Sequence, residues 1–324
     1  MVGYTLRRLL QSVFTIFVLT ILLFVLLKLM PGDPAIVMAG IGAELEVIEG
    51  IREELGLNKP WPVQYWRFTG GLLTGNLQAM TYHKPVWTVI LERLPATFEL
   101  GLFAIIIALV VSIPAGLLSA IYRNSLLDYT VTTVALMGIS IPVFWFALML
   151  MLVFGVILRI LPVSGRGATA TLFGWPWLRI SCITWDGFQH MIIPSIALAS
   201  VFMAMNARLT RASMLEVLRQ DYVTTARAKG LKERVVLIKH AFRNALAPVV
   251  TNVGMQIGTL VAGAVLTETT TAWPGLGRLM IEALQRRDQM VVFGLALFTA
   301  IVFQVSYLVV DLMYAYIDPR IAYD

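Results

Sequence analysis

The chain has one cysteine and few charged residues, and each shortage excludes a class of protein. Cys182 is the single cysteine among 324 residues, so no disulfide can form within the chain. Asp, Glu, Lys and Arg together make up 14% of the residues, well below the roughly 25% that is usual in a soluble domain. Hydrophobic residues make up 58%. The composition therefore excludes an ordinary soluble protein and predicts an all-α integral membrane protein.

The sequence also lacks the patterns that would carry chemistry. It contains no G-x-x-x-x-G-K-[ST] phosphate loop, and the glycines between Gly275 and Leu279 do not fit one. His83, His190 and His240 are scattered and have no metal-ligand spacing. No cluster of acids and histidines marks a membrane-embedded enzyme. We therefore predict no catalytic, cofactor-binding or metal-binding residues in this chain.

Six apolar segments are long enough to cross a membrane at roughly 20 residues each. The first follows Arg7 and Arg8, is longer than the apolar core of a signal peptide and has no small-x-small cleavage site after it, so we expect a retained helix. The third is interrupted at Ile141-Pro142, and Pro114 and Gly116 are expected kinks in the second. The predicted spans are 9–30, 97–121, 129–158, 191–207, 247–266 and 290–316.

Basic residues decide which side of the membrane each loop occupies. Residues 208–243 carry nine Lys and Arg against three acids, which predicts a cytoplasmic loop. An even number of spans then places both termini in the cytoplasm. The net charge of +6 is explained in the same way and not by nucleic acid. The prediction is one membrane domain, 1–324, with an external insertion at 31–95 that contains a short helix, 44–55, closed by Gly56, and a cytoplasmic loop at 208–246.

The cytoplasmic loop is basic and amphipathic. Residues 221–229 fit a short helix that Gly230 would end in a left-handed conformation. Pro248 is expected in the first turn of the next membrane helix. Such a helix–turn–helix could bind a groove on a partner or rest on anionic lipid, and the residues leave both open. After Gly230, one apolar stripe is predicted at helical spacing: Leu231, Val235, Ile238, Phe242, Ala245 and Leu246.

Polar side chains within the spans are candidates for a translocation pathway, because they are costly in lipid. Each could instead form a hydrogen bond between helices. Glu99 and Glu268 fall near the predicted outer ends of spans, where a charged group can reach water. The pathway candidates are Ser140, Asn206, Asn252, Gln256, Thr259 and Glu268.

Trp273, Pro274 and Gly275 form a predicted turn before the last span. A tryptophan in such a turn is expected to anchor at the depth of the lipid headgroups, and the glycine permits a tight backbone. The turn could serve as an outer gate, as a docking point for a protein on the outer face, or as a plain connector.

Several ordered motifs resemble one family of membrane proteins. SMLEVLRQDYVTTARAKGL and KHAFRNALAPVVT are similar to the coupling loop of ATP-binding-cassette importer permeases. RRLL, LMPGDPA, RLPATFELG, PVSGR, GAVLTETTTAWPGLGRLMIEALQRRD and DPRI resemble the dipeptide/oligopeptide/nickel branch, most closely the first permease subunit of dipeptide transporters. Thr224, Thr225 and Ala226 stand where the general pattern has Glu-Ala-Ala, and this branch typically carries a Thr-Ala-Arg version.

The resemblance implies a type I importer permease in a bacterial or archaeal cytoplasmic membrane, working by alternating access. It implies a second homologous permease, two ATPases that bind ATP and Mg²⁺, and a periplasmic or lipid-anchored binding protein. Dipeptides are the expected substrate, with nickel complexes, glutathione and longer oligopeptides left open. A secondary transporter would predict inverted repeats, and we find none. The residues expected to couple to the ATPases are Asp221, Thr224, Thr225, Ala226, Arg227, Ala228, Lys229 and Gly230.

Overall fold

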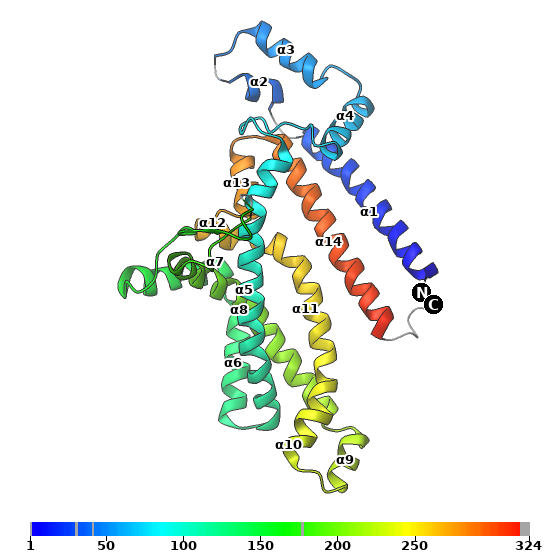
Figure 1. Ribbon diagram of the computed structural model, residues 1–324, viewed down its shortest axis with the longest axis vertical. Coiled ribbons are helices and arrows are strands. Elements are labelled where there is room, and N and C mark those ends of the chain that lie inside the picture. Colours follow the sequence, from blue (N-terminus) through cyan, green and yellow to red (C-terminus); the bar gives the residue numbers. More distant parts are fainter. Residues whose placement is uncertain (1, 30–31, 41, 176–177, 318–324) are drawn as a thin grey trace.

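The computed structural model is an elongated assembly of helices (Figure 1). It describes residues 2–29, 32–40, 42–175 and 178–317; for residues 2–5, 257–263 and 310–317 it describes the helical backbone only. The closing DPRI motif lies outside the described residues. Helices α2 (Pro34–Ala39), α3 (Leu45–Leu55) and α4 (Trp61–Leu73) gather at one end, and α9 (Asp221–Ala228) and α10 (Glu233–Val235) lie at the other.

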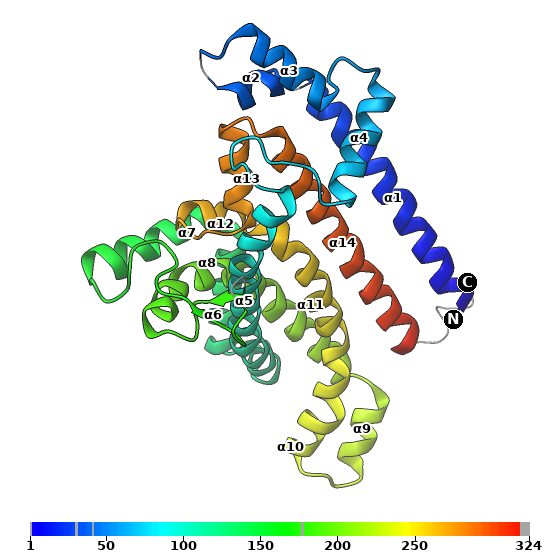
Figure 2. The ribbon, with the colours of Figure 1, turned by 45° about the horizontal axis from the view of Figure 1, so that its top comes forward.

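Helices α1 (Val2–Leu29) and α14 (Gln289–Ile317) pack side by side, as both views of the ribbon show (Figures 1 and 2). A hydrogen bond from Gln304 to Ser12 joins them at 2.8 Å. The predicted first and last spans are thus present as helices. The predicted short helix of the external insertion is also confirmed as α3, and Gly56 closes it with a φ of 67°.

Helices α5 (Val86–Ile121) and α8 (Trp185–Val217) form the central pair. Small residues allow the two backbones to approach closely: a Cβ on Gly116 would lie 2.5 Å from the carbonyl oxygen of Ala207. Both helices are longer than predicted. Pro95 was expected to precede the second span but lies inside α5, because neighbouring groups in a helix bundle can compensate for a lost backbone donor.

The predicted interruption of the third span is confirmed as a sharp bend. Helix α6 (Leu126–Ser140) ends at Ile141, and α7 (Val143–Leu150) with the π-helix η1 (Met151–Ile157) continues at 106° to it. Pro142 lacks an N–H and clashes with the preceding turn, so the helix cannot continue straight. The segment α7–η1 therefore runs away from the bundle, and the loop after it holds an antiparallel pair of strands, β1 (Ala170–Thr171) and β2 (Arg179–Ile180).

The second half of the loop that was predicted to be cytoplasmic is continuous with the next membrane helix. Helix α10, the π-helix η2 (Val236–Phe242) and α11 (Arg243–Gly263) follow one another without a turn. The prediction that Pro248 opens the span is wrong, because Pro248 lies inside α11. Helix α12 (Val265–Thr270) follows, and α13 (Leu276–Gln285) replaces part of the loop that was expected before the last span.

Four helices within the described residues are long and apolar enough to cross a membrane, or five if the bent pair α6–α7 is one span. The fold is thus that of an all-α membrane protein. The predicted number of six spans stays a prediction.

Candidate functional site

The helix α9 lies at one end of the molecule with most of its surface exposed. Val223 and Ala226 are buried against the end of α8 and η2, and they hold the helix in place. Of the eight predicted coupling residues, Ala226 is therefore a packing residue. The other seven are exposed: Asp221, Thr224, Thr225, Arg227, Ala228, Lys229 and Gly230. They present a polar, accessible helix surface that a partner could contact.

Gly230 ends α9 in the predicted left-handed conformation. Its φ is 75°, and its backbone N–H donates to the carbonyl of Arg227 at 2.9 Å. A Cβ on Gly230 would meet no heavy atom within 4 Å. The need for glycine at this position therefore comes from the backbone angle and not from crowding.

Two polar contacts fix the turn after Gly230. The guanidinium of Arg227 pairs with the carboxylate of Glu233 at 2.8 Å, and this hydrogen bond lowers the pKa of Glu233. The amide of Asn244 donates to the hydroxyl of Tyr222 at 2.9 Å. Both contacts are at the surface, so their energies are small. They orient α9 relative to the helix that leads into the membrane.

The predicted apolar stripe after Gly230 is wrong in its first half and confirmed in its second. Leu231, Val235 and Ile238 of the stripe are exposed, whereas its later members Phe242, Ala245 and Leu246 are buried or partly buried. Val236 and Ala241, which were not part of the predicted stripe, are buried. The π-helix η2 explains the difference, since its wider turn puts residues five apart, such as Val236 and Ala241, on the same face. A pattern search at α-helical spacing cannot detect that shift.

An ion cluster joins three helices at the same end of the bundle. Asp128, in the first turn of α6, is buried and accepts hydrogen bonds from both the Nε and the NH2 groups of Arg211 in α8 at 2.6 and 2.9 Å. The hydroxyl of Ser119, near the end of α5, donates to the same carboxylate. A bidentate, charge-assisted contact between a guanidinium and a carboxylate is strong and directional. Sequence analysis missed the cluster, because its members come from three separate segments.

Three of the predicted pathway residues bond to one another. Asn252 donates to the side-chain oxygen of Asn206 at 2.8 Å, and Gln256 donates to the same oxygen at 3.2 Å. All three are buried between α8 and α11. This geometry favours the alternative reading, a hydrogen-bonded contact between membrane helices.

The remaining pathway candidates lie elsewhere. Ser140 is exposed at the end of α6 and donates to the carbonyl of Leu136 in its own helix at 2.9 Å. The side chain of Thr259 lies outside the described residues. Glu268 is separate from both and belongs to the end of the bundle opposite α9, described below, which we predict to be external and call the outer end. The five candidates whose side chains the structure describes therefore do not form one cluster.

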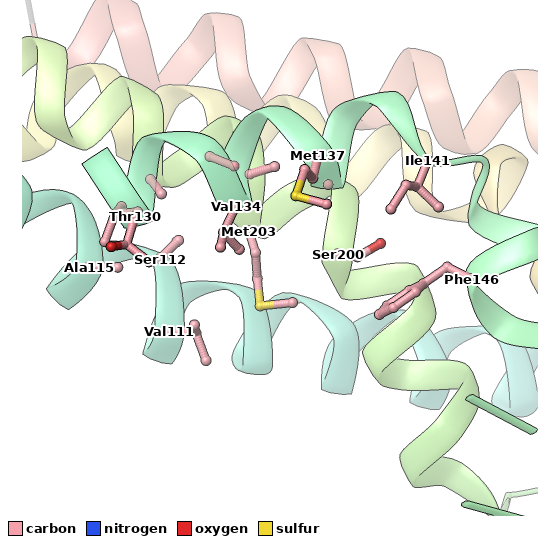
Figure 3. A pocket seen from close by; sticks show the side chains of 15 residues that line it. Val111, Ser112, Ala115, Thr130, Val134, Met137, Ile141, Phe146, Ser200 and Met203 are labelled. Carbon is pink, nitrogen blue, oxygen red and sulfur yellow. The ribbon is translucent and has the colours of Figure 1, made fainter. Parts of the chain in front are cut away.

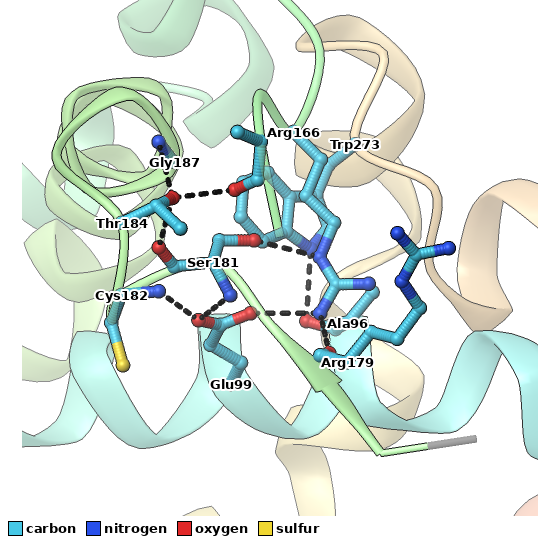
Figure 4. A network of polar contacts seen from close by, with 10 residues as sticks. Ala96, Glu99, Arg166, Arg179, Ser181, Cys182, Thr184, Gly187 and Trp273 are labelled. Atoms are coloured by element: carbon cyan, nitrogen blue, oxygen red, sulfur yellow. Dashed lines mark hydrogen bonds and ion pairs between the residues drawn. The ribbon is translucent and has the colours of Figure 1, made fainter. Parts of the chain in front are cut away.

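Glu99, in the first half of α5, is the centre of a polar network (Figure 4). One carboxylate oxygen accepts the backbone N–H groups of Ser181 and Cys182 at 2.7 and 2.6 Å. The other accepts a hydrogen bond from Arg166 at 2.9 Å. Arg166 also donates to the Ser181 hydroxyl and to the carbonyl of Arg179. The expectation that Glu99 reaches water is wrong, because its side chain is 4% exposed.

Glu268 is likewise buried and not solvated as expected. One oxygen accepts the hydroxyl of Thr97 at 2.6 Å, and the other accepts the backbone N–H groups of Gly277 and Arg278. Those N–H groups open α13, where a negative charge is favoured by the helix dipole. Gly275 is required here, since a Cβ on it would lie 2.1 Å from a Glu268 oxygen. Glu268 thus caps α13 and ties it to α5.

Trp273 is fully buried, so the prediction that it anchors among lipid headgroups is wrong. Its ring N–H donates to the carbonyl of Ala96 at 2.8 Å, and the guanidinium of Arg166 lies 5.7 Å from its ring centroid. The tryptophan fills the space between α5, α8 and the turn before α13. The turn Trp273–Gly275 is therefore anchored in the bundle by the buried side chain of Trp273.

An apolar cavity of about 450 Å³ lies between α5, α6, α7 and α8 (Figure 3). Its lining includes Val111, Val134, Met137 and Phe146 and contains no charged residue. The hydroxyls of Thr130 and Ser200, which also line it, bond to carbonyls of their own helices. Ser112 also lines the cavity, and its buried hydroxyl has no hydrogen-bond partner among the described residues. The cavity therefore offers a mainly apolar surface with no charged group.

Comparison with known proteins covers almost the whole chain. Residues 112–323 match the model of the binding-protein-dependent transport system inner membrane component, and residues 1–101 match the N-terminal model of the same systems. The chain is 43% identical to the dipeptide transport system permease protein DppB of Alkalihalophilus pseudofirmus over 333 residues, which cover 100% of both chains.

Two further relatives are named for other transport systems. The chain is 40% identical to the oligopeptide transport system permease protein AppB of Bacillus subtilis and 39% identical to the glutathione transport system permease protein GsiC of Pectobacterium atrosepticum, each over 100% of both chains. Members of this family are permease subunits of transport systems and not enzymes. Taken with its helical membrane fold, these matches mean that the chain belongs to the family of binding-protein-dependent transport system inner membrane components.

Proposed function

We propose that this chain is a transmembrane permease subunit of an ATP-driven importer of short peptides, with dipeptides as the first candidates. The dipeptide permease relatives, at 43% identity over nearly their whole length, support the substrate class. The observation that supports the mechanism is the exposure of helix α9. Gly230 ends this helix, and its buried residues are Val223 and Ala226. This helix is the surface that an ATPase subunit would bind.

The proposed complex contains a second homologous permease, two cytoplasmic ATPases and a binding protein at the outer face. ATP and Mg²⁺ would be held by the ATPases. Association of the ATPases would move α9, and the membrane helices would then open the pathway to one side at a time. ATP can drive that change only by binding one state more tightly than the other.

Co-purification with ATPase measurement tests this proposal. Tagged chain purified from membranes should bring down a second permease and ATPases, and ATP hydrolysis should require those subunits. A binding protein loaded with a dipeptide should stimulate the hydrolysis. ATPase activity in the rigorously purified single chain, or purification without any ATPase, would contradict the proposal.

The proposed orientation places both termini and α9 in the cytoplasm of a bacterial or archaeal cell, below its cytoplasmic membrane. Tags at the N-terminus, at Ser125 and at the C-terminus should be accessible from inside only. Tags near Ala43, Gly167 and Leu276 are expected outside. A tag beside Arg227 that is reached from outside would overturn the orientation.

The relatives do not point to one substrate, since some are named as glutathione or oligopeptide permeases. Uptake of labelled dipeptides, glutathione and nickel into vesicles that hold the complete complex separates these. Uptake of dipeptides alone supports the first candidate, whereas uptake of glutathione or nickel alone would replace it.

A further inference from the structure

Three segments at the outer end of the bundle are joined in pairs, so that they close a ring. Glu99 of α5 holds the loop between η1 and α8, here called the outer loop. The carbonyl of Ala96, also in α5, accepts the ring N–H of Trp273 in the turn before α13. The outer loop and the turn are joined directly, because the backbone N–H of Gly165 donates to the carbonyl of Thr271 at 2.9 Å. Arg166 and Trp273 add a second contact between the same two segments. We call this set the outer ring.

The opposite end of α5 is also tied by a buried carboxylate. Ser119 near its last turn contacts Asp128, and Asp128 binds Arg211 of α8. Helix α8 ends at Val217, and α9 begins at Asp221. Helix α5 is continuous from Val86 to Ile121, so Glu99 in the outer ring and Ser119 at the ion cluster are joined by one helix, roughly 30 Å apart at 1.5 Å per residue.

Close packing makes it hard for α5 to move independently of α8. Ala104, Ala108 and Ala199 are fully buried in the cluster that the two helices share. At Gly116 the backbones are so close that a methyl group would not fit. Densely packed helices of this kind move as units and transmit displacement.

We infer that α5 links the outer ring mechanically to the coupling helix α9. Its positioning residues are Glu99, in α5 itself, and Asp128 of α6, which contacts the inner end of α5 through Ser119. This inference rests on the proposed function. A binding protein that displaces the outer loop would move α5 through Glu99. The inner end of α5 would then shift α8 through Asp128 and Arg211, and with it α9. Neither carboxylate contacts substrate or ATP in this scheme.

The test uses the complete complex with its loaded binding protein and measures the ratio of stimulated to basal ATP hydrolysis. Glu99→Gln keeps an acceptor for Ser181 and Cys182 but removes the charge that faces Arg166. Asp128→Asn likewise keeps an oxygen that can accept the Ser119 hydroxyl but removes the charge that faces Arg211. Each variant should lower the ratio about fivefold or more, the range of ordinary allosteric couplings, while basal hydrolysis by the ATPases is unchanged.

The double variant tests whether the two residues act in one chain of contacts. If both act through α5, Glu99→Gln with Asp128→Asn should lower the ratio no further than the more damaging single change. Independent roles would instead give additive losses on a logarithmic scale, as is usual for distant sites. Additive losses would overturn the inference.

Asp288→Asn is the matched control. Asp288 is a buried carboxylate that accepts the backbone N–H and hydroxyl of Thr81 and the backbone N–H of Val291, so it caps α14 and touches neither end of α5. Its loss should reduce thermal stability but leave the ratio unchanged. An equal fall in the ratio for Asp288→Asn would mean that general destabilisation explains the effect.

Two further outcomes are decisive. If the complex with Glu99→Gln does not assemble, Arg166→Lys replaces it in the test. This change keeps the positive charge but removes the guanidinium contacts to Ser181 and Arg179. Unchanged ratios in the Arg166 or Glu99 variant and in Asp128→Asn would overturn the inference while the proposed function stands. An unmodified complex that shows no stimulation at all would overturn the proposed function, and the inference with it.

Discussion

The outer end of the bundle and helix α9, at the opposite or inner end, hold their polar groups in opposite ways. At the outer end, Glu99 and Glu268 are buried, and each accepts hydrogen bonds from segments far apart in the sequence. In the segment of α9, the ion pair of Arg227 and Glu233 is exposed and joins residues six positions apart. The outer end is tied by long-range buried contacts, whereas α9 is held by local surface contacts and two buried side chains.

This difference indicates which parts can move at low energetic cost. Breaking one partner of a buried, hydrogen-bonded charge pair costs several kcal/mol, whereas an exposed pair contributes about 0–1 kcal/mol. The outer ring should therefore move as a unit, and α9 can adjust to a partner with small changes. A coupling helix needs that freedom, because it must stay bound while the partner changes shape.

The largest expected effect is at the outer end. Trp273→Ala should destabilise the chain by about 3–5 kcal/mol, because it empties a fully buried site and removes the hydrogen bond to Ala96. Thermal unfolding in detergent measures this. Trp185→Ala is the control, since Trp185 is 73% exposed and should change stability by no more than about 0.5 kcal/mol. Equal losses for the two tryptophans would refute the description of the turn as buried.

Gly275→Ala should cost about 1–3 kcal/mol, because the added methyl collides with the Glu268 carboxylate. The same measurement should show Gly50→Ala to be neutral or stabilising, since Gly50 lies in the middle of α3 with nothing within 4 Å of its Cβ position. A neutral Gly275→Ala would mean that Glu268 does not occupy the site described.

Disrupting the buried amide cluster should have a moderate effect. Asn206→Ala is expected to cost about 0.6–2 kcal/mol, because it removes the oxygen that both Asn252 and Gln256 contact. Transport by the assembled complex should keep its order of preference among dipeptides. A changed order of preference, measured by competition uptake, would restore these three residues as pathway candidates.

At the inner end, Gly230→Val should cost on the order of 1 kcal/mol and act on function more than on stability. The valine must take a φ of 75°, so α9 should tilt and transport should fall, while insertion into the membrane is preserved. Gly230→Ala should be milder, and Lys232→Ala, an exposed change, milder still. Normal transport by assembled Gly230→Val complexes would favour the alternative that this segment rests on lipid.

The smallest effect is expected from Glu233→Gln, which removes only an exposed partner of Arg227. The pKa of Glu233 is lowered in the folded state, so the contribution of this pair is present above the ordinary value of 4.5 and is lost as the pH falls through the lowered pKa. Near neutral pH, transport by this variant should equal that of the unmodified chain. A large loss there would mean that the exposed pair does more than orient the turn.

The sequence predicted the elements whose evidence is local. The apolar runs of α1 and α14 needed only length and hydropathy, and the break at Pro142 followed from a missing N–H. Gly56 and Gly230 were recognised as helix ends because a left-handed residue follows each last turn. Helix α13 was missed in the sequence. The side chain that caps it is Glu268, which lies before the preceding turn and not directly before the first residue of the helix.

What the sequence by itself determined is the all-α membrane class, the family and the position of helix α9, for which we propose the coupling role, because periodicity, charge distribution and ordered motifs are properties of neighbouring residues. The tertiary structure alone decided that Glu99, Glu268 and Trp273 are buried. Those three side chains look like interfacial residues in the linear sequence, and only the partners brought to them by folding can satisfy their polar atoms away from water.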